Sequence, residues 1–294
     1  MRFRSVVPGL LALLGACSKN DVVSGSDSGT RTAPSASPSA TPSARISEDA
    51  GVPANGSPWP IERVLKVVNP EGQPVYSGPV GSVEGTITVT GAAPKQLALP
   101  VAERRKCNGD VAADASFAYR EDGIGAGVRG LRDALVYAVG YEGIVFERNL
   151  EKHVSIKGCV FDQRTVDVTF GQALVVKNED KIPLGPSLSK SETGVLSVAA
   201  PGGTARLYPA ELGPLALGMR LGPSFARATV YVLPHPLHTT SEVNGRYRID
   251  GIPVGAKINI RARHSAFSEE SAHEVEIRGG VVSKLDLELQ SVAK

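Results

Sequence analysis

Two neighbouring segments decide the fold class: Thr-Val-Asp-Val-Thr at residues 165–169 and Gln-Ala-Leu-Val-Val-Lys at residues 172–177. Both are rich in β-branched residues, and only Phe170 and Gly171 lie between them. Short β-branched runs bounded by turn residues are typical of β-strands. We therefore expect two consecutive strands here.

Comparable runs recur on both sides of these segments. Each is a strand candidate of about four to nine residues, and Gly, Pro or Asn bounds it. The further candidates are residues 82–90, 134–139, 153–156, 228–233, 245–249, 257–262, 273–277 and 284–289. Beyond the first 17 residues, no run combines sustained helical periodicity with caps. The pattern predicts an all-β protein made of sandwiches.

One turn has a specific signature. Asn244-Gly245 lies between two strand-like runs, and this dipeptide suits the positive φ angles of a tight turn. We expect a β-hairpin at this point.

The N-terminus has the order of a secretory signal. Two arginines precede the apolar run 6–14, and small residues follow just before Cys17. The run is too short to cross a bilayer, which takes about 20 apolar residues. The string 14–17, Leu-Gly-Ala-Cys, resembles the bacterial lipobox, in which the cysteine is lipidated after cleavage; an ordinary signal that happens to leave a cysteine is the alternative. We expect residues 1–17 to be a lipoprotein signal peptide and Cys17 to carry the membrane anchor, palmitate included.

Residues 18–60 change to Ser, Ala, Pro, Thr, Gly and Asp. Such a composition cannot bury a core, so we expect a disordered, solvated tether between the membrane and the folded part.

With Cys17 assigned to the lipid, Cys107 and Cys159 remain. In an exported protein an even remainder most often forms one disulfide, and closing this loop stabilises a fold by about 4 kcal/mol. Two unpaired buried thiols are the alternative.

Charge and composition argue against nucleic acid as a partner. The formal net charge is +2, from 32 basic and 30 acidic residues, and no segment concentrates one sign. Aromatic residues make up only 5% of the chain, which disfavours a surface for stacked bases.

Several segments, in this order along the chain, resemble bacterial proteins that join a plastocyanin-like (cupredoxin) domain to a carboxypeptidase-regulatory-like domain. They are residues 85–91, 107–109, 130–137, 156–161, 178–180, 228–232 and 244–255. The resemblance implies a Greek-key cupredoxin-like sandwich at 61–233, followed by a small transthyretin-like, carboxypeptidase-regulatory-like sandwich at 234–294. It also implies the pairing of Cys107 with Cys159.

The chain departs from this family at the copper ligands. A blue-copper centre needs two imidazoles and a thiolate, usually with a weak axial thioether. Leu184 stands where the resemblance places the first imidazole, and Arg220, Pro223 and Ala226 stand at the other three ligand positions. No His or Cys lies between Val160 and Leu233. We therefore expect a degenerate cupredoxin-like domain with no metal ligands and no cofactor.

The remaining histidines leave a metal hypothesis open. His235 and His238 are three residues apart, and His264 follows later. On a strand exit that contains Pro236 their rings need not face the same way, so we expect hydrogen-bonded packing residues.

Catalytic motifs are weak. Residues 125–130 formally match Gly-x-Gly-x-x-Gly but lack the flanking strand and helix, and the Ser187-x-x-Lys190 pair lacks its companion elements. We expect no enzyme activity and no catalytic residues.

The sequence thus predicts a lipid-anchored, non-catalytic binding or structural protein of the cell envelope, at the outer rather than the inner membrane. Its partner would be an envelope protein or glycan. One alternative is copper binding or electron transfer through His235, His238 or His264. The other is carbohydrate or peptide recognition by the C-terminal sandwich, although Tyr247 and Phe267 are too isolated to form an aromatic platform.

Overall fold

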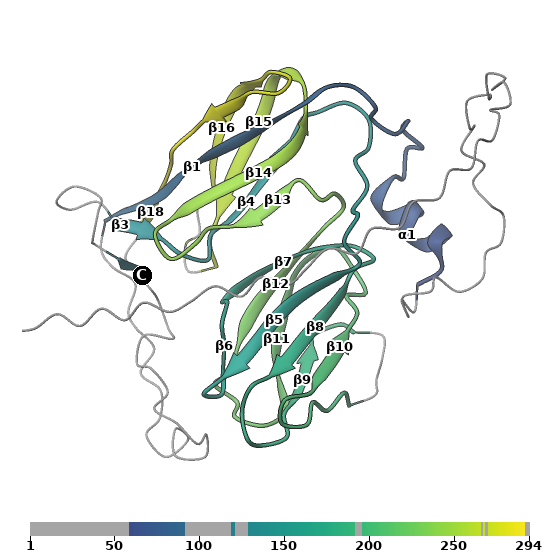
Figure 1. The fold of residues 1–294 in the computed structure, drawn as a ribbon, viewed down its shortest axis with the longest axis vertical. Helices are drawn as coiled ribbons and strands as arrows, with labels where there is room; N and C mark the ends of the chain where they lie inside the picture. Colours follow the sequence, from purple (N-terminus) through teal and green to yellow (C-terminus); the bar gives the residue numbers. More distant parts are fainter. Residues whose placement is uncertain are drawn as a thin grey trace, which may run out of the picture. The chain divides into compact units, whose positions relative to one another are not determined.

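The computed structural model describes residues 59–91, 119–120, 129–191, 196–265, 267 and 270–291. The expected signal peptide, nearly all of the tether, Cys17 and Cys107 lie outside these residues. Strands dominate the described part, which has a single α-helix (Figure 1). Within it, no helix is long and apolar enough to span a membrane. The expected all-β sandwich class is confirmed.

One sandwich is formed by a continuous stretch of chain, and we call it the 151–233 sandwich. Its first sheet has the order β10-β8-β5-β6 and its second the order β7-β12-β11-β9. The strands are β5 (Glu151–Lys157), β6 (Val160–Phe161), β7 (Thr165–Thr169), β8 (Ala173–Asn178), β9 (Gly185–Leu188), β10 (Thr204–Leu207), β11 (Gly213–Leu221) and β12 (Ala228–Leu233).

The core of this sandwich follows from the alternation of its strands. In β7, Val166 and Val168 point into the core, where Leu174 and Val176 of β8 also pack. All five residues of β7 are nevertheless buried, because its opposite face is covered as well. That second face carries Thr165, Asp167 and Thr169, and it adjoins β13.

The second sandwich combines residues from both ends of the described chain, and we call it the divided sandwich. Its first sheet contains β14-β1-β3-β2, with β17 and β18 also paired to β1; its second has the order β13-β4-β15-β16. The strands are β1 (Val80–Gly91), β2 (Tyr119–Arg120), β3 (Arg129–Leu131), β4 (Leu135–Val139), β13 (His238–Thr240), β14 (Arg246–Pro253), β15 (Gly255–Arg263), β16 (Ser271–Ile277), β17 (Val282–Lys284) and β18 (Leu287–Ser291).

The expected domain division at residues 233/234 is wrong. β1 pairs with β14 in antiparallel register and with β18 in parallel register. β4 pairs with both β13 and β15. The N-terminal strands therefore supply one half of the C-terminal sandwich, and their apolar residues share one buried core, for example Ile87 with Ile249 and Val136 with Ile260. The 151–233 sandwich is an insertion in the divided sandwich.

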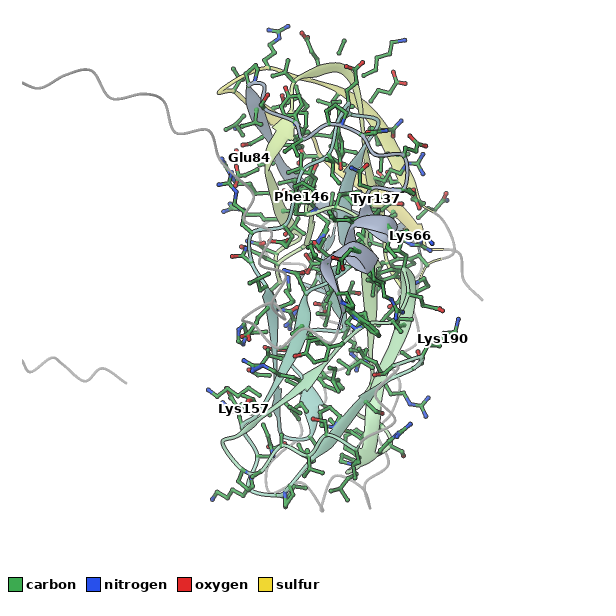
Figure 2. The ribbon with its side chains drawn as sticks, turned by 90° about the vertical axis from the view of Figure 1, so that its right-hand side faces the viewer. Lys66, Glu84, Tyr137, Phe146, Lys157 and Lys190 are labelled. Atoms are coloured by element: carbon green, nitrogen blue, oxygen red, sulfur yellow. The ribbon has the colours of Figure 1, made fainter. Side chains whose placement is uncertain are left out.

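The helix α1 (Ile61–Val68) was not expected from the sequence. It follows Pro60, has no side-chain cap and is only eight residues long, so the helical pattern in the sequence is short. Val64, Val67 and Val68 pack against the core of the 151–233 sandwich. Val64 comes close to Gly171, where an added Cβ would lie 3.0 Å from its Cγ1. Figure 2 labels Lys66 of α1 and Phe146, an exposed side chain that lines a small apolar cavity beside the helix.

The Asn244-Gly245 turn is present, but the expected hairpin is not. Gly245 has a φ of 81°, and its N–H donates to the carbonyl of Glu242 at 2.9 Å. The strands on either side belong to opposite sheets, since β13 pairs with β4 and β14 pairs with β1. The turn thus carries the chain from one layer of the sandwich to the other.

We predict that Gly245→Ala destabilises the protein by about 2 kcal/mol. A Cβ at this residue would lie 2.4 Å from the carbonyl oxygen of Ile87 and would also strain the positive φ. Urea unfolding followed by far-UV circular dichroism measures the effect. Gly202→Ala is the matched control, because Gly202 also has a positive φ but nothing lies within 4 Å of an added Cβ. An equal loss in both variants would show that backbone strain alone, and not the contact with Ile87, matters.

Candidate functional site

The first candidate site is the end of the 151–233 sandwich where the family resemblance places copper ligands. Leu184 is fully buried, and its backbone exchanges hydrogen bonds with Ala199 at 3.0 and 2.8 Å. Ala226 is buried in the same core cluster as Leu184, and Pro223 is buried too. Arg220 is exposed. Three of the four positions are therefore occupied by buried apolar residues.

Close packing fills this end of the sandwich. Gly222 has a φ of 124°, and an added Cβ would lie 2.9 Å from Cδ2 of Leu184. Met219 packs against the same cluster. Across the described residues, no group of three or more His, Cys, Asp or Glu side chains could hold a metal ion. Leucine, proline and alanine side chains offer no lone pair, so the geometry here supports packing rather than coordination.

The second candidate site is a buried polar network between the two sandwiches. Asp167 of β7 is its centre: one carboxylate oxygen lies 2.6 Å from Nζ of Lys152, and the other lies 2.8 Å from Nδ1 of His238. Nε2 of His238 lies 2.9 Å from the hydroxyl of Thr169. The network joins β5 and β7 to β13, the first strand of the divided sandwich after the insertion.

The pKa of Asp167 is held below its usual value despite its burial. Burial alone would raise this pKa, but the hydrogen bond from His238 and the charge of Lys152 outweigh it. Asp167 is therefore ionised at neutral pH.

The carboxylate, imidazole and hydroxyl of this network stand in the order found in nucleophilic catalysis. Two observations favour a structural role. Thr169 is only 3% exposed, and its hydroxyl also donates to Glu147 at 3.0 Å. A nucleophile held in this way is neither accessible nor free to transfer its proton to His238.

His235 lies near His238, but the two rings do not form a shared metal site. The ring centroids are 6.4 Å apart, and His235 meets Tyr141 edge-on at 5.8 Å. Nδ1 of His235 is buried without a hydrogen-bond partner among the described residues. Both ring nitrogens of His238 already take part in hydrogen bonds. His235 alone would therefore offer a nitrogen ligand to a metal ion here.

His264 takes part in a different contact. It is buried and packs against Phe267, with ring centroids 5.1 Å apart. Burial, with a smaller contribution from Arg164, lowers its pKa to about 4. The structure therefore places His264 as a neutral packing residue, apart from the contact between His235 and His238.

Cys159 is fully buried at the turn between β5 and β6. The carboxylate of Asp180 accepts hydrogen bonds from the N–H groups of Gly158 and Cys159, both at 2.7 Å. Asn178 is also fully buried and donates to the carbonyl of Ile182 at 2.8 Å. These bonds explain the Asn-x-Asp sequence at the end of β8. Since Cys107 lies outside the described residues, its pairing with Cys159 stays a prediction.

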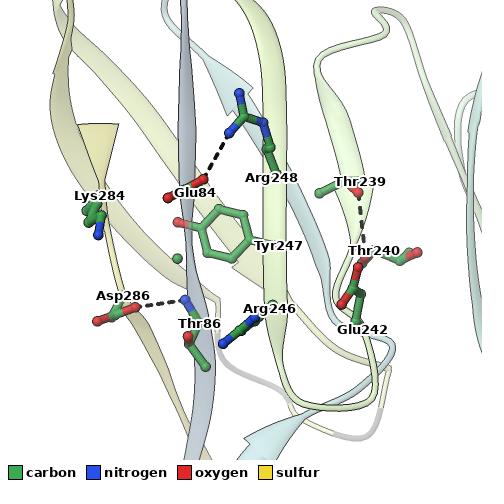
Figure 3. A pocket seen from close by; sticks show the side chains of 11 residues that line it. Glu84, Thr86, Thr239, Thr240, Glu242, Arg246, Tyr247, Arg248, Lys284 and Asp286 are labelled. Carbon is green, nitrogen blue, oxygen red and sulfur yellow. Dashed lines mark hydrogen bonds and ion pairs between the residues drawn. The ribbon is translucent and has the colours of Figure 1, made fainter. Parts of the chain in front are cut away.

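A polar hollow of about 720 Å³ lies on the outer face of the divided sandwich (Figure 3). Two of its acidic side chains have partners within the hollow: Arg248 contacts Glu84 at 2.9 Å, and Asp286 accepts from the N–H of Thr86 at 2.8 Å. Tyr247 is only 4% exposed, and its hydroxyl donates to the carbonyl of Leu285. It therefore offers no exposed ring on which a sugar could stack.

Comparison with known proteins gives a limited result. No family model matches the chain, and no curated protein sequence matches it. Among solved structures, a Cu(I) form of an amicyanin mutant aligns with 30% of this chain and 86% of its own, at 19% identity and a TM-score of 0.24. Amicyanin from Paracoccus versutus aligns with 33% of this chain and 97% of its own, at 13% identity and a TM-score of 0.25.

A copper-containing nitrite reductase from Thermus scotoductus aligns with 32% of this chain and 24% of its own, at 14% identity and a TM-score of 0.24. Similarities of this size carry no functional argument. The assignment of the chain to all-β sandwiches rests on the strand pairing described above.

We predict that the stability of the protein falls by about 3 kcal/mol between pH 6.5 and pH 4 on account of His235. Burial, aided by the charge of His238, lowers the pKa of His235 from 6.5 to about 4. In this range the unfolded chain takes up a proton that the folded protein does not, so acid favours unfolding.

Urea unfolding at several pH values measures this slope. His235→Asn is expected to make it shallower, while the exposed His153→Asn is the control and is expected to leave it unchanged. Equal slopes for the wild type and His235→Asn would contradict the assignment.

Proposed function

We propose that this chain is a lipid-anchored, non-catalytic binding or structural protein of the cell envelope, built on a cupredoxin-like sandwich that holds no copper. The observation that carries the proposal is the apolar filling around Leu184, where Ala226 shares the same buried cluster. In such a sandwich, packed side chains occupy the positions of the copper ligands. Its loops and sheet faces remain as surfaces for a partner, so it acts as a scaffold.

Electron transfer through unconventional histidine ligands is less well supported. Blue copper requires a thiolate beside its imidazoles. His238 is committed to Asp167 and Thr169, and His264 packs against Phe267. A copper site shared by His235 and His238 would need His238 to leave Asp167, and Lys152 would then be the remaining partner of this buried carboxylate.

The absence of catalysis belongs to the same proposal. The network that has the order of a catalytic triad has a buried hydroxyl at Thr169 and a second carboxylate, Glu147, bonded to it. Its position between β7 and β13 suits the joining of two sandwiches.

The copper-free scaffold is tested by adding Cu(II) to the full chain and measuring bound metal and visible absorption after desalting. We expect no copper above background and no thiolate-to-copper band, with amicyanin as the positive control. His235→Asn is measured in parallel. Stoichiometric copper in the wild type that is lost in His235→Asn would replace the scaffold proposal with copper carriage.

The lipid anchor is tested by Cys17→Ser. We expect the wild type to fractionate with membranes, at the outer rather than the inner membrane, and the variant to remain unprocessed or to lose its acyl groups, because several acyl chains are needed for stable anchoring. Intact-mass spectrometry of the wild type reads the acyl groups directly. A wild-type mass without acyl groups would end the lipoprotein assignment.

The same spectrum, recorded before and after reduction, tests the Cys107–Cys159 disulfide. Opening this disulfide by reduction adds two hydrogens to the mass.

A further inference from the structure

A second hollow, of about 620 Å³, lies on the outer face of the sheet formed by β9, β11 and β12. Its floor consists of small side chains on neighbouring strands. Gly218 faces Ser187 across one pair of strands, and Ala216 faces Thr229 across the next. Outward-facing residues of a sheet are usually long and polar, so four small ones in adjacent pairs leave a depression over the backbone.

The rim of this hollow is positively charged. Arg164, Arg220 and Arg227 line it, together with the hydroxyl groups of Ser224 and Ser265, and no Asp or Glu is among the described residues that line it. The net charge of the chain is only +2, so this concentration of arginines without carboxylates is a local feature.

Two of the three arginines have no carboxylate partner within the described ranges. Arg227 uses its Nε to donate to the backbone carbonyl of Ser224 at 3.0 Å, and neither Arg220 nor Arg227 forms an ion pair there. Arg164 is half-buried and feels the charge of Asp133. The nearby Lys190, which projects from the same sandwich in Figure 2, is paired with Glu211 at 2.6 Å.

Hydroxyl donors complete the lining. Ser187 and Thr229 stand on the floor, and the Oγ of Ser189 accepts the N–H of Ala216 at 2.8 Å, which leaves its own proton available. Guanidinium groups and hydroxyls around a small concave surface match an anion with several acceptor oxygens.

We propose that this hollow binds a phosphate group, carried either by a small soluble molecule or by the headgroup of an anionic lipid. This inference rests on the proposed binding role and gives it a ligand class. Arg220 and Arg227 supply the charge, the serine and threonine hydroxyls supply further donors, and Gly218 supplies the space.

Phosphate binding is tested by isothermal titration calorimetry of the full chain in a non-ionic detergent at low salt, with inorganic phosphate as the probe. We expect saturable binding that weakens about tenfold in the Arg220→Gln/Arg227→Gln double variant, as for the loss of charge-assisted hydrogen bonds. Gly218→Leu is expected to abolish binding while the protein stays folded, because an added Cβ meets only the carbonyl oxygen of Ala226 at 3.9 Å. Arg246→Gln, which lies in the hollow of Figure 3, is the control and retains binding.

A second arm measures flotation of the full chain with vesicles of phosphatidylglycerol or phosphatidylcholine, using the same variants in a Cys17→Ser background so that no acyl anchor contributes. Binding to phosphatidylglycerol that needs Arg220, Arg227 and Gly218, without binding of free phosphate, assigns the site to a lipid headgroup. If neither probe binds, or if all variants bind equally, the proposal is wrong. Copper loading is measured separately, so a failure here leaves the copper-free scaffold standing.

Discussion

The pairing of β1 with β14 constrains everything else in this structure. β1 runs for twelve residues, and it joins β14, β17 and β18 from the opposite end of the chain. A chain closed in this way must leave the divided sandwich after β4 and return to it at β13, and those two strands are hydrogen-bonded neighbours. The 151–233 sandwich therefore has its entry and exit close together. The bond between Asp167 and His238 lies near this junction and ties the inserted sandwich to the strand by which the chain returns.

Much of the secondary structure follows from local sequence. Strands β7, β8 and β12 lie almost where their β-branched runs predict them, since an apolar, β-branched run bounded by turn residues is a local signal. The sheets to which strands belong are not a local property. Nothing near residues 80–91 indicates that their partner is at residues 246–253, so local sequence predicts a division of the chain at residue 233, which the pairing contradicts. The hairpin expected at Asn244-Gly245 was wrong for the same reason: the dipeptide determines a turn of the chain, but pairing with distant strands decides whether a hairpin results.

The candidate sites also divide into those that the sequence could predict and those that it could not. The apolar positions Leu184 and Ala226 could be read against a family pattern, and the structure places both in one buried cluster. The polar network could not be read, because Asp167 and His238 are 71 residues apart. Its one visible signal was an aspartate in the middle of an apolar strand, which requires a buried partner. The arginine hollow had no signal at all, since its floor and rim come from four separate segments of chain.

The insertion also determines the order in which the molecule can be completed. Ser82 and Asp250 bond to each other although 168 residues separate them. As the chain is synthesised, β1 is released long before β14, while every strand of the 151–233 sandwich has its partners within one continuous stretch. The inserted unit can thus assemble on nascent chain while β1 still has an unpaired edge. Contacts of such long range make folding slow and leave apolar strand edges open to wrong partners, so a protein that depends on them needs protection until its last fifty residues emerge.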